Sequence, residues 1–345
     1  MARAAKKKKS AGGIALRVLI ALAAVVCLVL LGGRLYFRLP VLSYYRDSEK
    51  AFAIPGLWEG FVPQGISYDA ASDSFFVTGY QKGGGASPVY VVSRATGKAA
   101  GPVRLLKEDG GSFTGHAGGL SVWGDWVYIA GSRDACVYVY SREAILAAQA
   151  EEQVPCLGSV PTHIGEERVT VAFTTVSGDL LTVGEFYREP QYPTPESHKY
   201  TTPAGDRQQA LAASYRLDAS APLGLRPEAV CAYTLPDQAQ GMAVREGRVT
   251  VSTSWGAAFS RMLTYETDGL EPFAYIQAEG GQVPVYALDS AAQVAEDKFP
   301  PMSEEIEWVD GRLYTMCESA SNAYYFGKLT GGTWCYATRM APQDN

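Results

Sequence analysis

A hairpin-like pattern recurs five times along the chain, and no other feature constrains the fold as strongly. Each copy has a small or acidic start, an apolar segment, a short turn and a second β-rich segment. From the second copy onward the turns contain Gly124, Gly178, Gly247 and Gly311, which are 54, 69 and 64 residues apart. A unit of this length that repeats in tandem is typical of the blades of a β-propeller. The copies cover residues 64–80, 118–132, 169–186, 240–255 and 304–319.

The rest of the chain agrees with an all-β fold, because short β segments alternate with turns and amphipathic helical stretches are scarce. We expect a β-propeller with five four-stranded blades over residues 60–340; six blades would require a copy that the pattern does not show. Residues 41–55 are expected to supply the outermost strand of the last blade, which would close the ring. Residues 188–213, rich in Pro, Gln and Ser, are expected to form a surface insertion. Helix is expected only in short pieces, at residues 142–150 and 289–296.

The N-terminal region predicts a membrane anchor. Residues 14–31 form a run of 18 residues that is apolar except for Arg17, and as a helix it spans roughly 27 Å, just enough to cross a bilayer core. Arg3 and residues 6–9, all Lys, precede the run, whereas only Arg34 and Arg38 closely follow it. This bias predicts a basic cytoplasmic tail (1–12), a transmembrane helix (13–33) and a juxtamembrane linker (34–59).

The protein is therefore expected to be single-pass in the cell membrane, with its C-terminal domain extracytoplasmic. The competing interpretation is a cleaved secretory signal, which shares the basic start and the apolar middle. The length of the run, and the lack of a small-x-small cleavage pattern after it, favour an uncleaved signal-anchor.

The charge balance limits the partners. Beyond residue 40 the chain has 22 basic and 36 acidic residues, a formal net charge of −14. Such a surface argues against nucleic acid and anionic polymers, and it is compatible with cations or neutral ligands. Besides the membrane itself, we expect the partner to be an envelope or cell-surface protein or a small molecule.

An extracytoplasmic location permits disulfides. Cys136 with Cys156, and Cys317 with Cys335, are each about 20 residues apart, the interval of neighbouring strands in one sheet. We therefore expect these two bridges, with Cys231 left as a buried thiol. The absence of a CxxC pair gives no support to a zinc or redox site.

In a propeller, the starts of the innermost strands and the ends of the strands beside them surround one mouth of the central channel. The repeat therefore predicts a ligand-binding site on one face, with polar and acidic groups beside aromatic ones. The alternative is that these groups cap strand ends and hydrogen-bond loop backbones around a water-filled channel. The residues placed at this mouth are Gln64, Tyr80, His116, Ser132, Glu185, Gln240, Trp255, Glu304, Glu305 and Glu318.

Two of these residues are candidates for catalysis. His116 lies among glycines that leave its ring room to point into the channel, and as a general base it would need an orienting carboxylate, Glu185 or Glu318. A structural histidine that bonds a neighbouring loop is the alternative. Glu304, with the other carboxylates, is the candidate ligand of a hard divalent cation such as Ca²⁺. Sequence motifs of serine hydrolases, zinc proteases, P-loop proteins and dinucleotide-binding proteins are absent.

Taken together, the segments around Gln64, His116, Gln240 and Glu304, with the turn at 95–98, resemble the broad superfamily of YVTN, WD40-like and SMP-30/gluconolactonase-like β-propellers, in particular its anchored or secreted bacterial members. The resemblance covers roughly residues 60–340 and implies a fold rather than one function. SMP-30-like enzymes hold a catalytic divalent ion at the mouth, and Glu304 or Glu305 would be the counterpart of their glutamate. The Asn ligands of that family have no match, and Val171 occupies the ring position in the third copy.

Two functions remain open after the sequence alone. The favoured one is a membrane-tethered extracytoplasmic propeller that binds a ligand or another protein. The alternative is a divalent-metal-dependent hydrolase or lactonase that works at the channel mouth. The sequence leaves open whether the protein is an enzyme.

Overall fold

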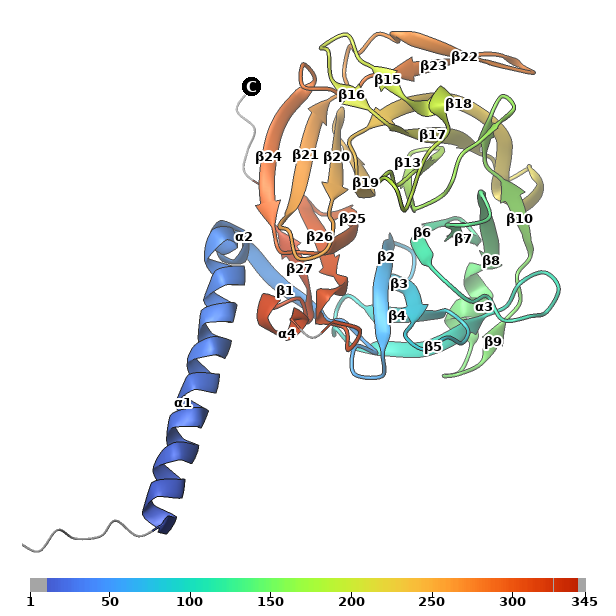
Figure 1. Ribbon diagram of the computed structural model, residues 1–345. Helices are drawn as coiled ribbons and strands as arrows, with labels where there is room; N and C mark the ends of the chain where they lie inside the picture. Colours follow the sequence, from blue (N-terminus) through green and yellow to red (C-terminus); the bar gives the residue numbers. More distant parts are fainter. Residues whose placement is uncertain (1–10, 325, 341–345) are drawn as a thin grey trace, which may run out of the picture.

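A long helix stands apart from a ring of β-sheets in the computed structural model, which describes residues 11–324 and 326–340 (Figure 1). This helix, α1 (Ala11–Arg38), continues through η1 (Leu39–Val41) into α2 (Leu42–Asp47) at the edge of the ring. In the described residues it is the one helix long and apolar enough to cross a membrane, and its most apolar window is fully exposed. The predicted cytoplasmic basic residues, Arg3 and Lys6 to Lys9, lie outside the described residues.

The described residues form five blades, which confirms the predicted five-bladed β-propeller (Figure 1). The innermost strands are β2 (Phe61–Asp69), β6 (Ala117–Trp123), β13 (Phe173–Ser177), β19 (Ala239–Arg245) and β25 (Ser303–Val309). The second strands are β3 (Ser74–Gln81), β7 (Trp126–Gly131), β14 (Leu180–Gly184), β20 (Arg248–Thr253) and β26 (Arg312–Cys317). The third strands are β4 (Pro88–Ser93), β8 (Cys136–Ser141), β17 (Ala210–Leu217), β21 (Ser260–Glu266) and β27 (Trp334–Thr338).

The outer strands differ from blade to blade. They are β5 (Ala99–Leu105) with β9 (Gln153–Val154) in the first blade, β10 (Gly158–Pro161) in the second and β24 (Gln293–Phe299) in the fourth. The third blade adds β18 (Leu225–Leu235), β23 (Gly281–Tyr286) and β22 (Ala274–Ala278). The fifth ends with β1 (Ser48–Ala53), which pairs antiparallel with β27 and so joins the two ends of the domain. Ring closure by an N-terminal strand protects the edge of the last blade.

The turns explain why the repeat was visible in the sequence. Gly124, Gly178, Gly247 and Gly311 have φ values of 57°, 61°, 72° and 74°, a left-handed conformation that suits glycine. In the first hairpin Asp73 occupies the comparable position with φ 47°. The recurring residues are thus those that the tight connection of two antiparallel strands requires.

Several short helices and hairpins lie outside the blade strands. They are α3 (Arg142–Ala147), η2 (Glu196–His198), η3 (Pro222–Gly224), η4 (Glu318–Ala320), α4 (Gly327–Thr330) and the hairpins β11 (His163–Ile164) with β12 (Glu167–Arg168) and β15 (Tyr200–Thr201) with β16 (Arg207–Gln208). The helix expected at 142–150 forms over its first part. The helix expected at 289–296 is wrong, because Asp289 caps a turn through the amides of Ala291 and Ala292 and the chain then enters β24. The insertion expected at 188–213 ends before Ala210, which begins β17.

The core lies between blades rather than in the centre of the ring. In the described chain five hydrophobic clusters separate neighbouring blades, and each draws on the facing sides of two sheets. In one of them Phe52 of β1 packs with Phe75 of β3 and Tyr314 of β26. This arrangement leaves polar side chains of the innermost strands to line the axis.

Candidate functional site

A β-bulge recurs at the start of the innermost strands. In the described chain the register shifts between Pro63 and Gly65, between Ala117 and Leu120, between Ala239 and Gly241, and between Ser303 and Ile306. The third blade, whose innermost strand is shorter, pairs without such a shift. A bulge places an unpaired residue in the strand and turns its side chain in a new direction. The bulged residues include Gln64, Gln240, Glu304 and Glu305, all of which the sequence predicted at the mouth.

Glu305 connects the last blade to three others. Its Oε2 accepts hydrogen bonds from the backbone N–H of Ile66 at 2.7 Å and of Leu120 at 2.9 Å. Its Oε1 accepts from the backbone N–H of Thr174 at 2.9 Å. The carboxylate is 1% exposed, and burial raises its pKa while the three backbone donors lower it. Through these bonds Glu305, which the sequence predicted as a ligand-binding residue, joins four blades at the ring centre.

Two glycines make this central contact possible. A Cβ atom on Gly119 would lie 2.5 Å from both Glu305 Oε1 and the Thr174 amide nitrogen. A Cβ atom on Gly241 would lie 2.6 Å from Glu305 Cα. The innermost strands therefore approach one another at distances that only glycine allows. At this level the axis is filled by backbone and by one carboxylate.

Glu304 turns the other way from the same bulge. It is 2% exposed, and its Oε1 has no hydrogen-bond partner among the described residues. Burial is the main reason that its pKa is well above the usual range, and the nearby charges of Glu318 and Glu305 add to the effect. An unsatisfied buried carboxyl oxygen is costly, so a site of this kind calls for an explanation.

Gln64 joins the second carboxyl to the histidine. Its Nε2 donates to Glu318 Oε2 at 3.0 Å, and its Oε1 lies 3.3 Å from His116 Nδ1. Burial raises the pKa of Glu318 to about 7, although hydrogen bonds from Tyr324 and Gln64 oppose the shift. The orienting partner of His116 is thus an amide and not the carboxylate that we expected from the sequence.

The surroundings of His116 favour its neutral form. Burial, and then the charge of Arg133, lower the pKa of His116. A neutral ring can donate from Nδ1 to Gln64 and leave Nε2 as an acceptor. The ring packs against Tyr80 with 4.3 Å between the ring centroids, and the Tyr80 hydroxyl lies 3.4 Å from that of Tyr324. We call Gln64, Tyr80, His116, Glu304, Glu318 and Tyr324 the mouth cluster.

An aromatic group from the third and fourth blades flanks this cluster. Phe186, Tyr192 and Trp255 lie with ring centroids 5.2 to 6.0 Å apart, and Arg188 covers the Trp255 ring at 4.1 Å. Tyr192 and Trp255 remain partly exposed. Tyr192 is also among the groups that raise the pKa of Tyr80, which places it within electrostatic reach of the mouth cluster. Exposed aromatic faces beside buried polar groups are typical of ligand sites.

Besides Glu305 and Trp255, three more predicted residues lie outside this cluster. Glu185 is fully buried within the third blade, where its Oε2 lies 3.0 Å from His198 Nδ1 and accepts from the Leu211 amide at 3.1 Å. Glu185, which the sequence placed at the mouth and offered as a partner of His116, is instead paired with His198 of the insertion. Ser132 donates to the His116 carbonyl at 3.2 Å, and Gln240 is half-buried at the start of β19.

Sequence reasoning missed Tyr192 and Tyr324. Tyr192 belongs to the insertion, and Tyr324 follows η4, so neither lies in the repeated hairpin. The one available signal for Tyr324 was its closeness to Glu318 in the chain, six residues away. Closeness in the chain does not predict where the Tyr324 ring points, because the conformation of the loop decides this.

The donor set does not fit the divalent metal that the family resemblance implies. Among the described residues no group of three or more His, Cys, Asp and Glu side chains is arranged to hold a metal ion. Glu305 already serves three backbone amides, and burial holds the pKa values of Glu304 and Glu318 high, which favours their protonated forms. A hard cation needs several ionised oxygen ligands.

All six cysteines belong to the described residues, and all are free thiols. Neither expected bridge is formed. Cys136 lies opposite Pro161, so Cys156 is several residues further along the strand pair. Cys317 in β26 and Cys335 in β27 lie on neighbouring strands, as expected, but their thiols are not bonded. Cys335 belongs to the hydrophobic cluster between the last and first blades.

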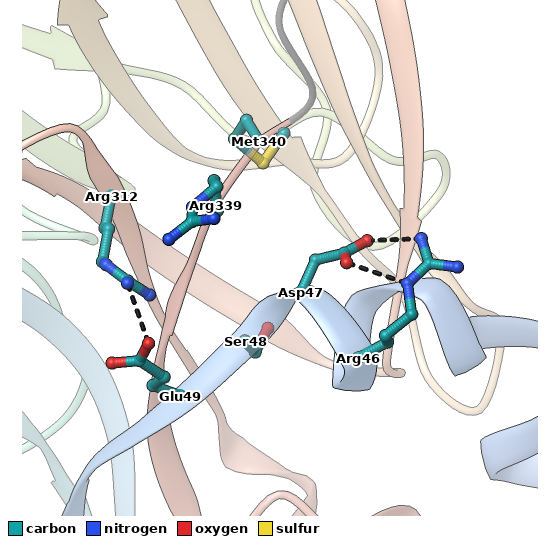
Figure 2. Close-up of a pocket in the computed structure, with 7 residues that line it drawn as sticks. All are labelled: Arg46, Asp47, Ser48, Glu49, Arg312, Arg339 and Met340. Carbon is teal, nitrogen blue, oxygen red and sulfur yellow. Dashed lines mark hydrogen bonds and ion pairs between the residues drawn. The ribbon is translucent and has the colours of Figure 1, made fainter.

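A cavity of about 370 Å³ lies at the ring closure, away from the mouth cluster (Figure 2). Arg46 pairs with Asp47 at 2.8 Å, and Arg312 pairs with Glu49 at 2.8 Å across the opening, where Figure 2 shows both pairs. Its charges are largely paired with one another, and it holds none of the buried unsatisfied side-chain atoms. We therefore regard the mouth cluster as the better candidate. The lining residues are Arg46, Asp47, Ser48, Glu49, Arg312, Arg339 and Met340.

Comparison with known proteins adds little beyond this geometry. No protein-family model and no curated protein matches the chain. Among solved structures, Myxococcus xanthus glutaminyl cyclase is similar with 11% identity and a TM-score of 0.43, over 84% of this chain and 94% of that one. A luciferin-regenerating enzyme is similar with 12% identity and a TM-score of 0.44, over 84% of this chain and 95% of that one. A Xanthomonas campestris gluconolactonase is similar with 12% identity and a TM-score of 0.39, over 84% of this chain and 89% of that one. At these values the likenesses carry no functional argument, and the description of the chain as a β-propeller rests on its own strands.

Proposed function

We propose that this protein is a membrane-tethered, extracytoplasmic β-propeller that binds a small hydrogen-bond-donating ligand at the mouth cluster. The tether is α1, whose apolar side chains are exposed and whose length suits a bilayer. The orientation is supported by the basic residues that precede the helix in the sequence.

The observation that carries the ligand site is Glu304 Oε1. It is a buried acceptor without a hydrogen-bond partner in the described chain, and a second, half-buried carboxyl, Glu318, lies close enough to raise its pKa. A ligand hydroxyl or ammonium group that donates to Oε1 would remove the cost of this unsatisfied oxygen. In Glu305 of the same strand, by contrast, both carboxylate oxygens accept hydrogen bonds from backbone amides.

The surroundings narrow the class of ligand. The net charge of −14 beyond residue 40 opposes an anionic ligand. Tyr192 and Trp255 offer partly exposed aromatic faces that suit the apolar face of a sugar or the cation of a small amine. The proposal therefore specifies a neutral polyhydroxylated or a cationic ligand, and it excludes small carboxylates and phosphates.

The test is a thermal-shift panel on the full chain in detergent, with sugars, polyols, small amines and matched anions. We expect stabilisation by at least one neutral or cationic compound, lost in Glu304→Gln and retained in Glu296→Gln. Glu296 is a matched control because it undergoes the same chemical change in an exposed ion pair with Arg261. Stabilisation by anions alone, or equal binding by both variants, would contradict the proposal.

The metal-dependent hydrolase makes a different prediction. If it were correct, calcium would raise the melting temperature of the full chain, and Glu304→Gln and His116→Ala would abolish the rise. Because the donor set lacks three suitable side chains in the described residues, we expect calcium to produce no such shift. A calcium-dependent shift that both variants remove would restore the hydrolase interpretation.

A further inference from the structure

The end of α1 is built into the domain, in contrast to the linker that the sequence suggested. A Cβ atom on Gly33 would lie 2.9 Å from Leu329 Cδ1 of α4, so the two segments are in contact. Phe37 stacks on Phe326 with 5.8 Å between the ring centroids, and Val41 and Tyr44 are buried. Figure 1 shows α4 beside the upper part of α1. The orientation of the ring relative to the helix is therefore fixed by packing.

Trp58 is held outward next to this contact. Its side chain is 72% exposed, the most exposed large hydrophobic side chain among the described residues. Its backbone carbonyl accepts a hydrogen bond from Asn322 Nδ2 at 2.7 Å, and Lys328 Nζ lies 4.1 Å from the ring centroid. Lys328 also donates to the Ala320 carbonyl. The loop that carries Trp58 is thus tied to the segment around α4, and the ring faces outward.

We call Trp58, Lys328 and α4 the corner. Its position along the length of α1 follows from the same contact. Leu329 touches Gly33, the last residue of the expected transmembrane span, and Lys328 is the neighbour of Leu329. Tyr36 and Leu39 extend the exposed apolar surface of the helix beyond Gly33. Trp58 and Lys328 therefore lie near the level at which the helix leaves the hydrocarbon. Tryptophan, tyrosine and long cationic side chains prefer this interfacial layer.

The charge of the corner differs from that of the rest of the domain. Arg38 approaches Gly331 beside α4, and Lys82 donates to the Asn322 carbonyl at 3.0 Å. With Lys328 and with Arg34 on α1, basic side chains gather in a domain that is otherwise acidic. Glu59 is the acidic side chain adjacent to Trp58 in the chain. Local positive charge beside exposed aromatic rings is complementary to a lipid headgroup region.

We propose that Trp58, Lys328 and α4 form a second membrane contact, which rests in the headgroup layer of the bilayer that α1 crosses. The inference rests on the proposed membrane span, and it adds that the propeller lies against the membrane in one orientation rather than swinging on a tether. Two attachment points, α1 and this corner, would hold the mouth cluster at a constant position relative to the lipid surface.

The test uses the full chain in vesicles of phosphatidylcholine and phosphatidylglycerol, with and without brominated acyl chains that quench nearby tryptophans. We expect quenching in the wild type and a loss of most of it in Trp58→Phe. The matched control is Trp255→Phe, which removes a partly exposed tryptophan at the mouth. That variant is expected to keep the quenching of the wild type.

Flotation of the same samples separates this inference from the proposed tether. If the chain floats with the vesicles and Trp58→Phe alone loses the quenching, the second contact is supported. If it floats and both variants are quenched equally, the second contact is overturned while the span survives. If the full chain fails to float, the span and the second contact are both overturned.

Discussion

Two neighbouring carboxyls, Glu304 at the mouth and Glu305 at the ring centre, come from one β-bulge and have opposite environments. Glu305 receives hydrogen bonds from the backbones of three other blades. Glu304 is equally buried, yet one of its oxygens has no partner in the described chain. The difference shows that burial alone does not separate a structural carboxyl from a candidate ligand-binding one. The hydrogen-bond partners do.

The largest expected effect is that of Glu305→Gln. An amide NH₂ would face backbone N–H donors, so at least one of them would lose its acceptor. We expect the free energy of unfolding to fall by about 2 to 4 kcal/mol, measured by urea denaturation of the full chain in detergent. Glu304→Gln, the same change one residue earlier, is the control and should cost far less. Equal losses in both variants would remove the distinction between the two carboxyls.

The second prediction concerns pH and the mouth cluster. Burial raises the pKa of Glu318 to about 7 from a usual value of 4.5, so between these values the folded protein holds a proton that the unfolded chain has released. Stability from this group is therefore complete below pH 4.5 and is lost as pH rises through 7. We expect Glu318→Gln to flatten this decline, by on the order of 1 to 3 kcal/mol. Melting temperatures of both proteins at pH 5, 6, 7 and 8 provide the measurement, and parallel curves would contradict it.

The smallest expected effect is that of Glu296→Gln, which changes an exposed glutamate. The carboxylate pairs with Arg261 at 2.7 Å on the outer strand of the fourth blade. Surface ion pairs of this kind contribute about 0.2 to 1 kcal/mol and are screened by salt. We expect a change in urea midpoint near the limit of measurement, reduced further in 0.5 M salt (roughly a 4 to 5 Å Debye length). A loss as large as that of Glu305→Gln would show that glutamate substitution destabilises this fold without regard to position.

The architecture was accessible from the sequence because it repeats. Each hairpin needs a left-handed turn residue, and the four turn glycines made the copies visible. The mouth was accessible in part for the same reason, since Gln64, His116 and Glu304 lie at or just before the starts of the first, second and fifth copies. Residues outside the copies, such as Tyr324, had no comparable signal.

The errors share a physical cause. Glu185 ends its strand where the repeat predicts, but it turns to His198 of the insertion, and no local pattern encodes that partner. The helix expected at 289–296 gave way to pairing of β24 with β21, a long-range interaction that outweighs local propensity. The Cys136–Cys156 bridge depended on strand register, which the spacing of residues does not specify.

By itself, the sequence determined the class of fold, the number of blades and the presence of an apolar N-terminal helix, because periodicity and hydropathy are local properties of the chain. Only the tertiary structure decided how Glu304 and Glu305 differ, because a bulge sends adjacent side chains in directions that depend on the neighbouring blades. It also decided that the end of α1 packs against α4. Both outcomes are set by contacts between segments far apart in the chain.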